Sequence, residues 1–422
     1  MKKSKNLLLG LLALLMMSSL SLANGLNLNS LGTRALSMGG AFVGLADDFS
    51  TIFWNPAGIA NFTNKTFGFY GTDILPSGTY KLTHPLLGTL VDAKTVSKSY
   101  LAGMAAYIHP ITENLVAGLG VYTPSGLGAT WDPTQLAAIS GGAKNIEWTS
   151  LIGMVTISPT LAYKISDMFQ IGASLNINYA MFDIKMYGGS YGVFSLGQYD
   201  STMTGWGLGA TFGLLFKPSS MFSFGATFRS ASSVSFSGKA TMTNLTALHI
   251  PAESDITRDL TWPMWLAGGV AFKPVENLTL TADVQYTNWK KIDKITTTYK
   301  DTMWNLLMVA SGKNITLMNW KDATQIRFGA EYKISPAFAV RAGYYYDPRP
   351  AVDETMNILL PNYDFNVLAF GIGYAADGLL LEAGFEYLMG KEISIPLTML
   401  LAMPGVYNMT IVAPNVSISY RF

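Results

Sequence analysis

Short segments in which apolar and polar residues alternate run through most of the chain. In the segment 170–179, Ile171, Leu175 and Ile177 fall on one face, whereas Asn176 and Asn178 fall on the other. Similar alternation occurs at 278–286, 325–332 and 379–388. A period of two residues predicts β-strands with one apolar and one polar face. Such strands are typical of a barrel with lipid outside and a polar lumen inside.

About fourteen segments of this kind can be counted. They lie near 65–73, 98–109, 113–123, 151–165, 168–183, 203–217, 221–237, 257–273, 278–292, 320–333, 337–347, 365–376, 379–389 and 411–422. Short connections such as 164–167 alternate with long ones such as 124–150. Short turns at one end and long loops at the other are typical of outer-membrane barrels. The pattern therefore predicts an all-β fold, with a transmembrane antiparallel β-barrel over residues 65–422.

The composition agrees with a membrane protein. Charged residues make up 13% of the chain, compared with about 25% in soluble domains. The net charge of +1 gives no general attraction for nucleic acid. There is no cysteine, which excludes disulfides, cysteine zinc sites and thiol catalysis.

The first residues have the pattern of a secretory signal peptide. Lysines at positions 2, 3 and 5 precede an apolar run over 7–17, and small residues at positions 21 and 23 suit a signal peptidase. The run is too short to cross a membrane, which needs about 20 residues. We expect residues 1–23 to be removed, so that the mature chain begins at Asn24.

Residues 24–64 fit neither strand alternation nor a long helix. The part from 32 to 62 is rich in Gly and Ala, and it contains Asn55-Pro56-Ala57. Asn55 is a suitable N-cap, and Pro56 suits the first turn of a short helix because no N–H is needed there. This segment is predicted to be a compact plug, or hatch, of short helical turns inside the lumen.

The hatch sequence resembles that of the FadL/TodX family of outer-membrane transporters for hydrophobic compounds. The resemblance rests on GGAFVGLADD at 39–48 and FWNPAGI at 53–59, and it continues through 121–133, 262–293, 319–354 and 361–390. It implies a barrel with fourteen strands and an N-terminal hatch. The alternating C-terminal segment ends at Phe422, which resembles the strand that the barrel-insertion machinery recognises.

No catalytic or metal-binding motif is present in the sequence. The three histidines, at 84, 109 and 249, have no metal-site spacing, and Walker, G-x-S-x-G and H-E-x-x-H motifs are absent. We therefore predict no enzymatic activity, no cofactor and no metal. Three alternatives remain: an acyl hydrolase that pairs His249 with a strand serine, a porin for polar solutes, and a purely structural or adhesive barrel. The inward charges, Arg229, Asp283, Arg327, Glu331, Arg341, Glu382, Glu386 and Arg421, are interpreted as a structural network.

The long loops are unusually apolar. Apolar residues outside a membrane either pack together or bind an apolar ligand. The candidates for a ligand-binding groove are Leu127, Trp131, Leu136, Tyr187, Tyr191 and Phe194. Packing alone is the alternative interpretation for each of them.

The resemblance also implies a route through the barrel wall. In the family the third strand bends inward and opens a lateral gap, and here Gly118 and Gly120 share one face of that strand. Packing of the hatch against the two glycines is the alternative. Fatty-acid transporters of the family hold the carboxylate with basic residues. The segment 314–319 has no lysine where one is expected, although Lys313 or Lys321 could replace it.

The sequence thus predicts a passive transporter of hydrophobic small molecules in the outer membrane of a Gram-negative bacterium. The ligand would be a long-chain fatty acid or an aromatic or aliphatic hydrocarbon. External loops would collect it, a pocket above the hatch would receive it, and hatch movement or a lateral opening would release it. The expected partners are this ligand, outer-membrane lipids with lipopolysaccharide, and the insertion machinery. The hatch is expected to face the periplasm.

Overall fold

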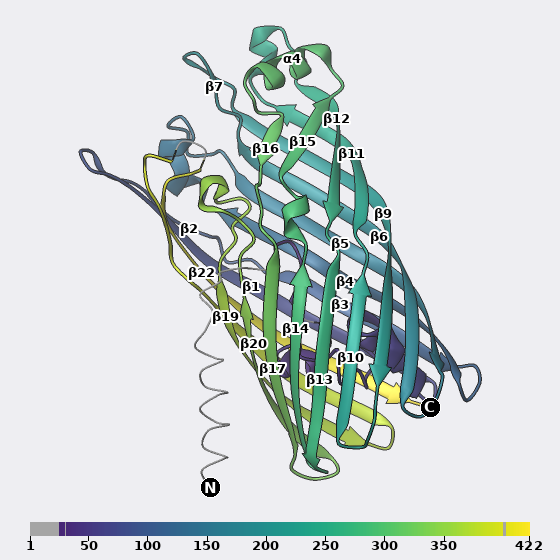
Figure 1. Cartoon of the computed structure of the whole chain (residues 1–422). Helices are drawn as coiled ribbons and strands as arrows, with labels where there is room; N and C mark the ends of the chain where they lie inside the picture. The colour runs from purple at the N-terminus through teal and green to yellow at the C-terminus, as the bar shows by residue number, and fades with distance from the viewer. Residues whose placement is uncertain (1–24, 30, 400–401) are drawn as a thin grey trace.

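The alternating segments form one closed antiparallel barrel in the computed structural model, which describes residues 25–29, 31–399 and 402–422 (Figure 1). Closure occurs between β1 and β22, whose register runs from Thr66↔Arg421 to Lys81↔Val406. The predicted signal peptide lies outside the described residues. Among those described, no helix is long and apolar enough to cross a membrane.

Fourteen strands build the wall when two interrupted strands are each counted once. They are β1 (Thr66–His84), β3 (Tyr100–Pro110), β4 (Leu115–Trp131), β5 (Trp148–Lys164), β6 (Phe169–Tyr187), β9 (Gln198–Phe216), β10 (Phe222–Arg229) with β11 (Ser232–Met242), β12 (Glu253–Trp262) with β13 (Trp265–Val275), β14 (Leu278–Thr287), β17 (Ala323–Lys333), β18 (Phe338–Asp347), β19 (Phe365–Ala376), β20 (Leu379–Gly390) and β22 (Gly405–Arg421). The predicted barrel class is confirmed.

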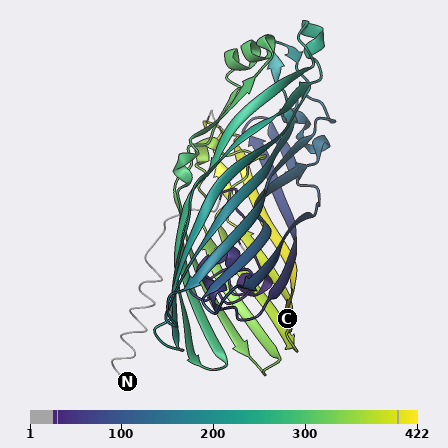
Figure 2. The same ribbon diagram turned by 90° about the vertical axis from the view of Figure 1, so that its right-hand side faces the viewer.

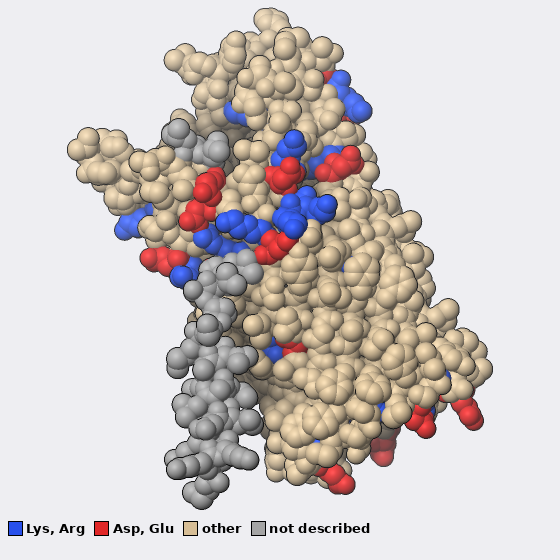
Figure 3. Space-filling view, viewed as in Figure 1, with Lys and Arg blue, Asp and Glu red and all other residues tan. Residues whose placement is uncertain are grey.

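Inward and outward faces follow the sequence pattern. Leu175 is 48% exposed on the outer face, whereas Asn176 is 4% exposed inside the barrel. Figure 3 shows a broad surface with very few charged side chains, bounded by more numerous charged residues above and below. This arrangement suits a wall whose outer face meets the hydrocarbon of a membrane.

The hatch fills the lower part of the lumen (Figure 2). It contains α2 (Thr33–Ser37), α3 (Thr51–Trp54) and the 3-10 helix η1 (Pro56–Asn61), and the chain then enters β1. Its apolar side chains, among them Phe42, Ile52 and Trp54, are almost completely buried. The sequence-predicted position of the short turns therefore agrees with the structure.

Several segments predicted as long loops extend the barrel as strands. The β1–β2 hairpin, with β2 at Gly88–Lys94, projects beyond the rest of the wall (Figure 1). The remaining elements at this end are η2 (Pro133–Ile139), β7 (Ser190–Tyr191), β8 (Phe194–Ser195), η3 (Leu245–Leu248), η4 (Trp289–Lys291), β15 (Lys294–Tyr299), α4 (Thr302–Ala310), β16 (Ile315–Leu317), η5 (Asp353–Thr355) and β21 (Ile393–Ile395). A large apolar cluster joins these loops to the upper lumen.

Candidate functional site

A chain of buried ion pairs anchors the hatch to the wall. Arg34 of α2 donates to Glu331 of β17 through Nε, at 2.7 Å, and it also pairs with Asp47. Arg341 of β18 donates to the same carboxylate at 2.7 Å, and its Nη1 lies 2.9 Å from Glu382 Oε1. Glu331 is thus shared by two arginines, one from the hatch and one from the barrel. The predicted structural role of these inward charges agrees with these contacts.

Main-chain groups of the hatch form further hydrogen bonds with side chains of β14 and β17. Asp283 of β14 accepts a hydrogen bond from the backbone N–H of Val43 at 2.7 Å. Arg327 donates to the Gly39 carbonyl at 3.0 Å. Together with the ion pairs, these bonds connect the hatch to several strands of the wall.

The side chain of Asn55 makes hydrogen bonds both within the hatch and to the barrel wall. Its Oδ1 accepts from Ala57 N at 3.2 Å, and its Nδ2 donates at 2.9 Å to the carbonyls of Val43 and Leu214. This position of the Asn55 side chain requires glycine at position 213, because a Cβ on Gly213 would lie 2.2 Å from Asn55 Oδ1. Pro56 occupies the first turn of η1, as its fixed backbone geometry favours.

Asn55→Ala should loosen the hatch without unfolding the barrel. The change would leave two buried carbonyls and one N–H without their partner, at a cost of about 1–3 kcal/mol. We expect a lower midpoint of thermal unfolding and a higher leak conductance in planar bilayers. The heat-modifiable gel mobility of a folded barrel should persist. Wild-type conductance in the folded variant would show that Asn55 does not hold the hatch closed.

A cavity of about 490 Å³ lies above the hatch. Apolar side chains from several strands form much of its wall, including Leu127, Ile152, Phe365, Leu388 and Met409. Its polar lining includes Asn27, Asn29, Thr72, Asp347 and Glu386. The cavity could therefore enclose an apolar molecule and offer it a few hydrogen-bond partners.

The barrel wall is open beside this cavity. Pairing between β3 and β4 stops at Met104↔Tyr122, above which Tyr100–Gly103 pairs only with β1. Farther up, Val96 N donates to Thr130 O at 2.7 Å and closes the gap from above. We call the gap between these two limits the slot. Leu101, which is 81% exposed on the outer face, belongs to the cavity lining, so the cavity reaches the outside of the wall.

The shape of β4 produces the slot. Its register with β5 shifts between Tyr122 and Ser125, at Thr123-Pro124. Proline cannot donate to a neighbouring strand, and an irregularity of this kind bends the strand locally.

Two segments partly cover the slot. The backbone of Leu28 donates to Pro124 O at 3.0 Å, and Gly126 N donates to Leu26 O at 3.2 Å, so the start of the described chain lies along β4. The Tyr100 ring lies against Gly128, where a Cβ would approach it to 2.3 Å. Movement of either group would change the width of the passage.

The predicted lateral-opening residues lie below the slot. Gly118 pairs with Ile108, and Gly120 pairs with Ala106, so the wall is continuous there. A Cβ at either position would meet Ile52 of the hatch, at 3.1 and 2.9 Å respectively. The two glycines thus make room for the hatch, and the opening lies several residues farther along the same strand.

The six predicted groove residues do not come together in one groove. Leu127 lines the cavity, whereas Trp131 and Leu136 are completely buried in the loop cluster. Trp131 Nε1 also donates to Ile358 O at 2.9 Å. Tyr187 and Phe194 pack against the edge of that cluster, and Tyr191 is 63% exposed. A binding role for these residues stays a prediction, with Leu127 the member best placed for it.

Sequence reasoning missed most of the cavity lining. Tyr70 and Thr72 of β1, Asp347 of β18 and Met409 of β22 come from three strands that are far apart in the sequence, and no local motif connects these strands. Glu386 was recognised as an inward charge, but alternation alone does not say how far up the barrel the hatch reaches.

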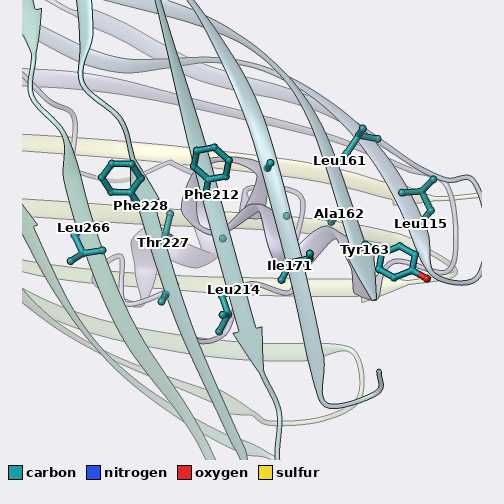
Figure 4. A pocket seen from close by; sticks show the side chains of 14 residues that line it. Leu115, Leu161, Ala162, Tyr163, Ile171, Phe212, Leu214, Thr227, Phe228 and Leu266 are labelled. Carbon is teal, nitrogen blue, oxygen red and sulfur yellow. The ribbon is translucent and has the colours of Figure 1, made fainter. Parts of the chain in front are cut away.

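A second hollow, of about 530 Å³, lies on the outer wall (Figure 4). It is rimmed by large apolar side chains from neighbouring strands, among them Leu161, Ile171, Phe212 and Phe228. These residues point away from the lumen, and the hatch lies behind the strands. Membrane hydrocarbon would contact this surface, so the enclosed cavity remains the candidate ligand site.

The three histidines lie outside the cavity lining. His84 Nδ1 accepts from Leu86 N, and His109 contacts the Tyr107 hydroxyl. His249 lies in an exposed loop after η3. Among the described residues, no group of side chains that could hold a metal ion is found.

A barrel with a plugged lower lumen, an enclosed cavity and an opening through its wall defines a membrane transport protein. The family model for outer membrane transport proteins (OMPP1/FadL/TodX) matches residues 14–409. The chain belongs to this family, and the family predicted from the sequence is confirmed.

Known relatives are similar over nearly the whole chain. The long-chain fatty acid transport protein of Escherichia coli K12 is 23% identical over 429 residues, which cover 91% of this chain and 92% of that protein. Outer membrane protein P1 of Haemophilus influenzae is 20% identical, with 84% of each covered. Among solved structures, a Pseudomonas aeruginosa FadL homologue has a TM-score of 0.76 at 17% identity, covering 94% of this chain and all (100%) of the other. The Pseudomonas putida toluene transporter TodX has a TM-score of 0.72 at 17% identity, covering 94% and 99%.

Proposed function

We propose that this protein carries small hydrophobic molecules inward across the outer membrane of a Gram-negative bacterium by passive diffusion. The single observation that carries the proposal is the cavity above the hatch, which continues through the slot to the outer face of the wall. The relatives include a long-chain fatty acid transport protein and a toluene transporter. Fatty acids and hydrocarbons are accordingly the two ligand classes to consider.

The first step is transfer of the ligand from water. The apolar surface of such a molecule is unfavourable in water, whereas the loops and upper lumen share one large apolar cluster. Leu127 and Met409 continue this apolar environment into the cavity. An apolar ligand can therefore move from the loops into the cavity while its surface stays shielded from water.

The second step is release from the cavity. The hatch below is held by buried ion pairs and hydrogen bonds. Of the residues that the structure describes, Tyr100 and the segment from Leu26 to Leu28 lie across the slot. Sideways release needs fewer contacts to break than removal of the hatch. We therefore favour the slot as the exit, and an apolar ligand would pass from it into the membrane.

The filled lower lumen favours this function over that of a polar porin. The hatch side chains Phe42, Ile52 and Trp54 are buried where a porin has an aqueous channel. The family consists of transporters, and we infer no enzymatic activity, no cofactor and no nucleic-acid partner. The expected partners outside transport are membrane lipids with lipopolysaccharide around the wall, and the insertion machinery at the strand that ends in Phe422.

Uptake by cells tests this function directly. A Gram-negative host that lacks its own transporter of this family would express the full chain, and entry of radiolabelled toluene and of a radiolabelled fatty acid would be measured. We expect faster entry of at least one of them, with no increase in entry of a labelled disaccharide. Faster disaccharide entry without any effect on the apolar compounds would identify a polar porin instead.

A further inference from the structure

One long loop folds into the upper lumen. Residues 348–364 connect β18 to β19 at the end of the barrel that lies away from the hatch. Ile358, Leu359 and Leu360 are almost completely buried, although they belong to no helix or strand. A loop that followed the outer rim would leave these side chains in water, which is unfavourable. We call residues 354–360 the strap.

The strap reaches a distant part of the wall. Trp131 of β4 donates through Nε1 to the carbonyl of Ile358 at 2.9 Å. Four strands, β20, β22, β1 and β3, separate β19 from β4 along the shorter way round the barrel. The backbone N–H of Met403, from the last long loop, donates to the Met356 carbonyl at 3.0 Å. The strap therefore crosses the upper lumen and is fixed at its far side.

The two ends of the loop are joined beside the strands that they leave. The backbone N–H of Arg349 donates to the Asp364 carboxylate at 3.0 Å, and the largely buried Arg349 side chain pairs with Asp353. These contacts do not involve the strap, whose apolar side chains pack into the cluster of the upper lumen. The strap can therefore move while the ends of the loop and both strands stay in place.

The strap lies between the outer loops and the cavity. Pro361, Asn362 and Tyr363, which follow it directly, belong to the cavity lining. Ile358 and Leu359 belong to the large apolar cluster that joins the loops to the upper lumen. An apolar ligand that moves from the loops to the cavity inside the barrel therefore has to displace these side chains.

We infer that the strap is a lid, which controls the rate at which apolar ligands pass between the outer loops and the cavity. Lifting the strap without a ligand exposes its apolar side chains to water, so the closed position is favoured. An apolar ligand covers those side chains as it passes and lowers the cost of opening, whereas a polar solute does not. The inference rests on the proposed function, and it adds a gate at the entrance that is separate from the hatch.

A disulfide can test the lid because the chain contains no cysteine of its own. Met356→Cys and Met403→Cys, made together, place two thiols on residues whose backbones are hydrogen-bonded, which suits the short Cα separation that a disulfide needs. The full-length barrel would be held in phospholipid nanodiscs, and mass spectrometry would confirm the bond. Stopped-flow fluorescence then follows binding of the uncharged probe N-phenyl-1-naphthylamine. We expect oxidation to slow association and dissociation by about tenfold or more each, with little change in Kd, and reduction to restore both rates.

Ser237→Cys with Thr257→Cys is the matched control. The two residues face each other on β11 and β12, so the same bond forms away from the strap and should change neither rate. Empty nanodiscs correct for partitioning of the probe into the lipid.

A strapless variant tests the same barrier without a disulfide. Residues 354–360 would be replaced by a short Gly-Ser linker, and heat-modifiable mobility checks that the barrel folds. This variant should bind and release the probe about tenfold faster than the wild type. Its planar-bilayer conductance should stay at the wild-type value, because the hatch still fills the lower lumen.

Three results would overturn the inference. Wild-type rates in both the oxidised pair and the strapless variant would show that ligand reaches the cavity by another path. A weaker Kd in the strapless variant, with an unchanged association rate, would make the strap part of the binding site instead of a lid. In both cases the proposed transport function stands, since ligand still binds. Failure of the wild-type barrel to bind the probe, with no uptake in cells, would remove the proposed function and the inference together.

Discussion

Gly126→Phe should reduce uptake of a hydrophobic ligand by about tenfold or more, because the new ring would fill the passage between cavity and slot. Gly126 lines the cavity beside the unpaired edge of β4. A Cβ there would meet only the Leu28 side chain, at 3.5 Å, so the substitution has room for its first atom. The measurement is uptake of radiolabelled toluene by cells, alongside binding of the fluorescent probe.

Gly71→Phe is the matched control for this prediction. Gly71 is outside the cavity lining, and a Cβ there would meet only the Phe69 ring, at 3.6 Å. The control adds the same ring without entering the passage, so uptake should stay near the wild-type value. If both folded variants transport normally, the slot is not the exit.

Glu331→Gln should destabilise the protein by about 3–5 kcal/mol, because it leaves two buried arginines without their shared carboxylate. The side chain of Glu331 is 3% exposed, and it contacts Arg34 from the hatch as well as Arg341 from the wall. We also expect higher leak conductance, since one main anchor of α2 is lost. Urea unfolding in lipid vesicles and planar-bilayer recording measure the two effects.

Asp47→Asn tests whether burial explains the size of that effect. Asp47 pairs with the same arginine, but its side chain is 30% exposed to solvent. Exposed ion pairs typically contribute less than about 1 kcal/mol, so this variant should be much milder. If Asp47→Asn and Glu331→Gln destabilise the protein equally, the buried ion pair is not the stronger one. The part-exposed pair between Arg34 and Asp47 would then contribute as much to stability.

The barrel could be predicted from sequence because its main signal is local. Alternation is present within each strand, so Leu175 and Asn176 were assigned to the correct faces. The hatch was similarly visible as a break in that pattern, with Asn55 and Pro56 marking a short helix. These features depend on neighbours in the chain rather than on the closed structure.

The ligand site could not be predicted to the same extent, because it depends on which distant edges remain unpaired. Pro124 signals an irregular strand, but only the positions of β3 and β5 show that the slot opens there. Alternation also does not reveal how densely the lumen is filled. Asn176 faces inward as expected, yet it bonds with Ser158 and Thr211 rather than with a water-filled channel.

The attachment of the hatch to the last strand has a consequence for assembly. Thr33 N donates to the Ser417 hydroxyl across 384 positions of sequence, and Phe422 N donates to Lys65 O where the hatch enters β1. Adjacent strands lie only about 4.8 Å apart, so a folded hatch has no way through a finished wall. The anchoring site on β22 exists only once the last strand is in place, so the bond between Thr33 and Ser417 cannot form before that strand has folded. Full anchoring of the hatch therefore comes late in folding, at or after the closure of the barrel between β1 and β22.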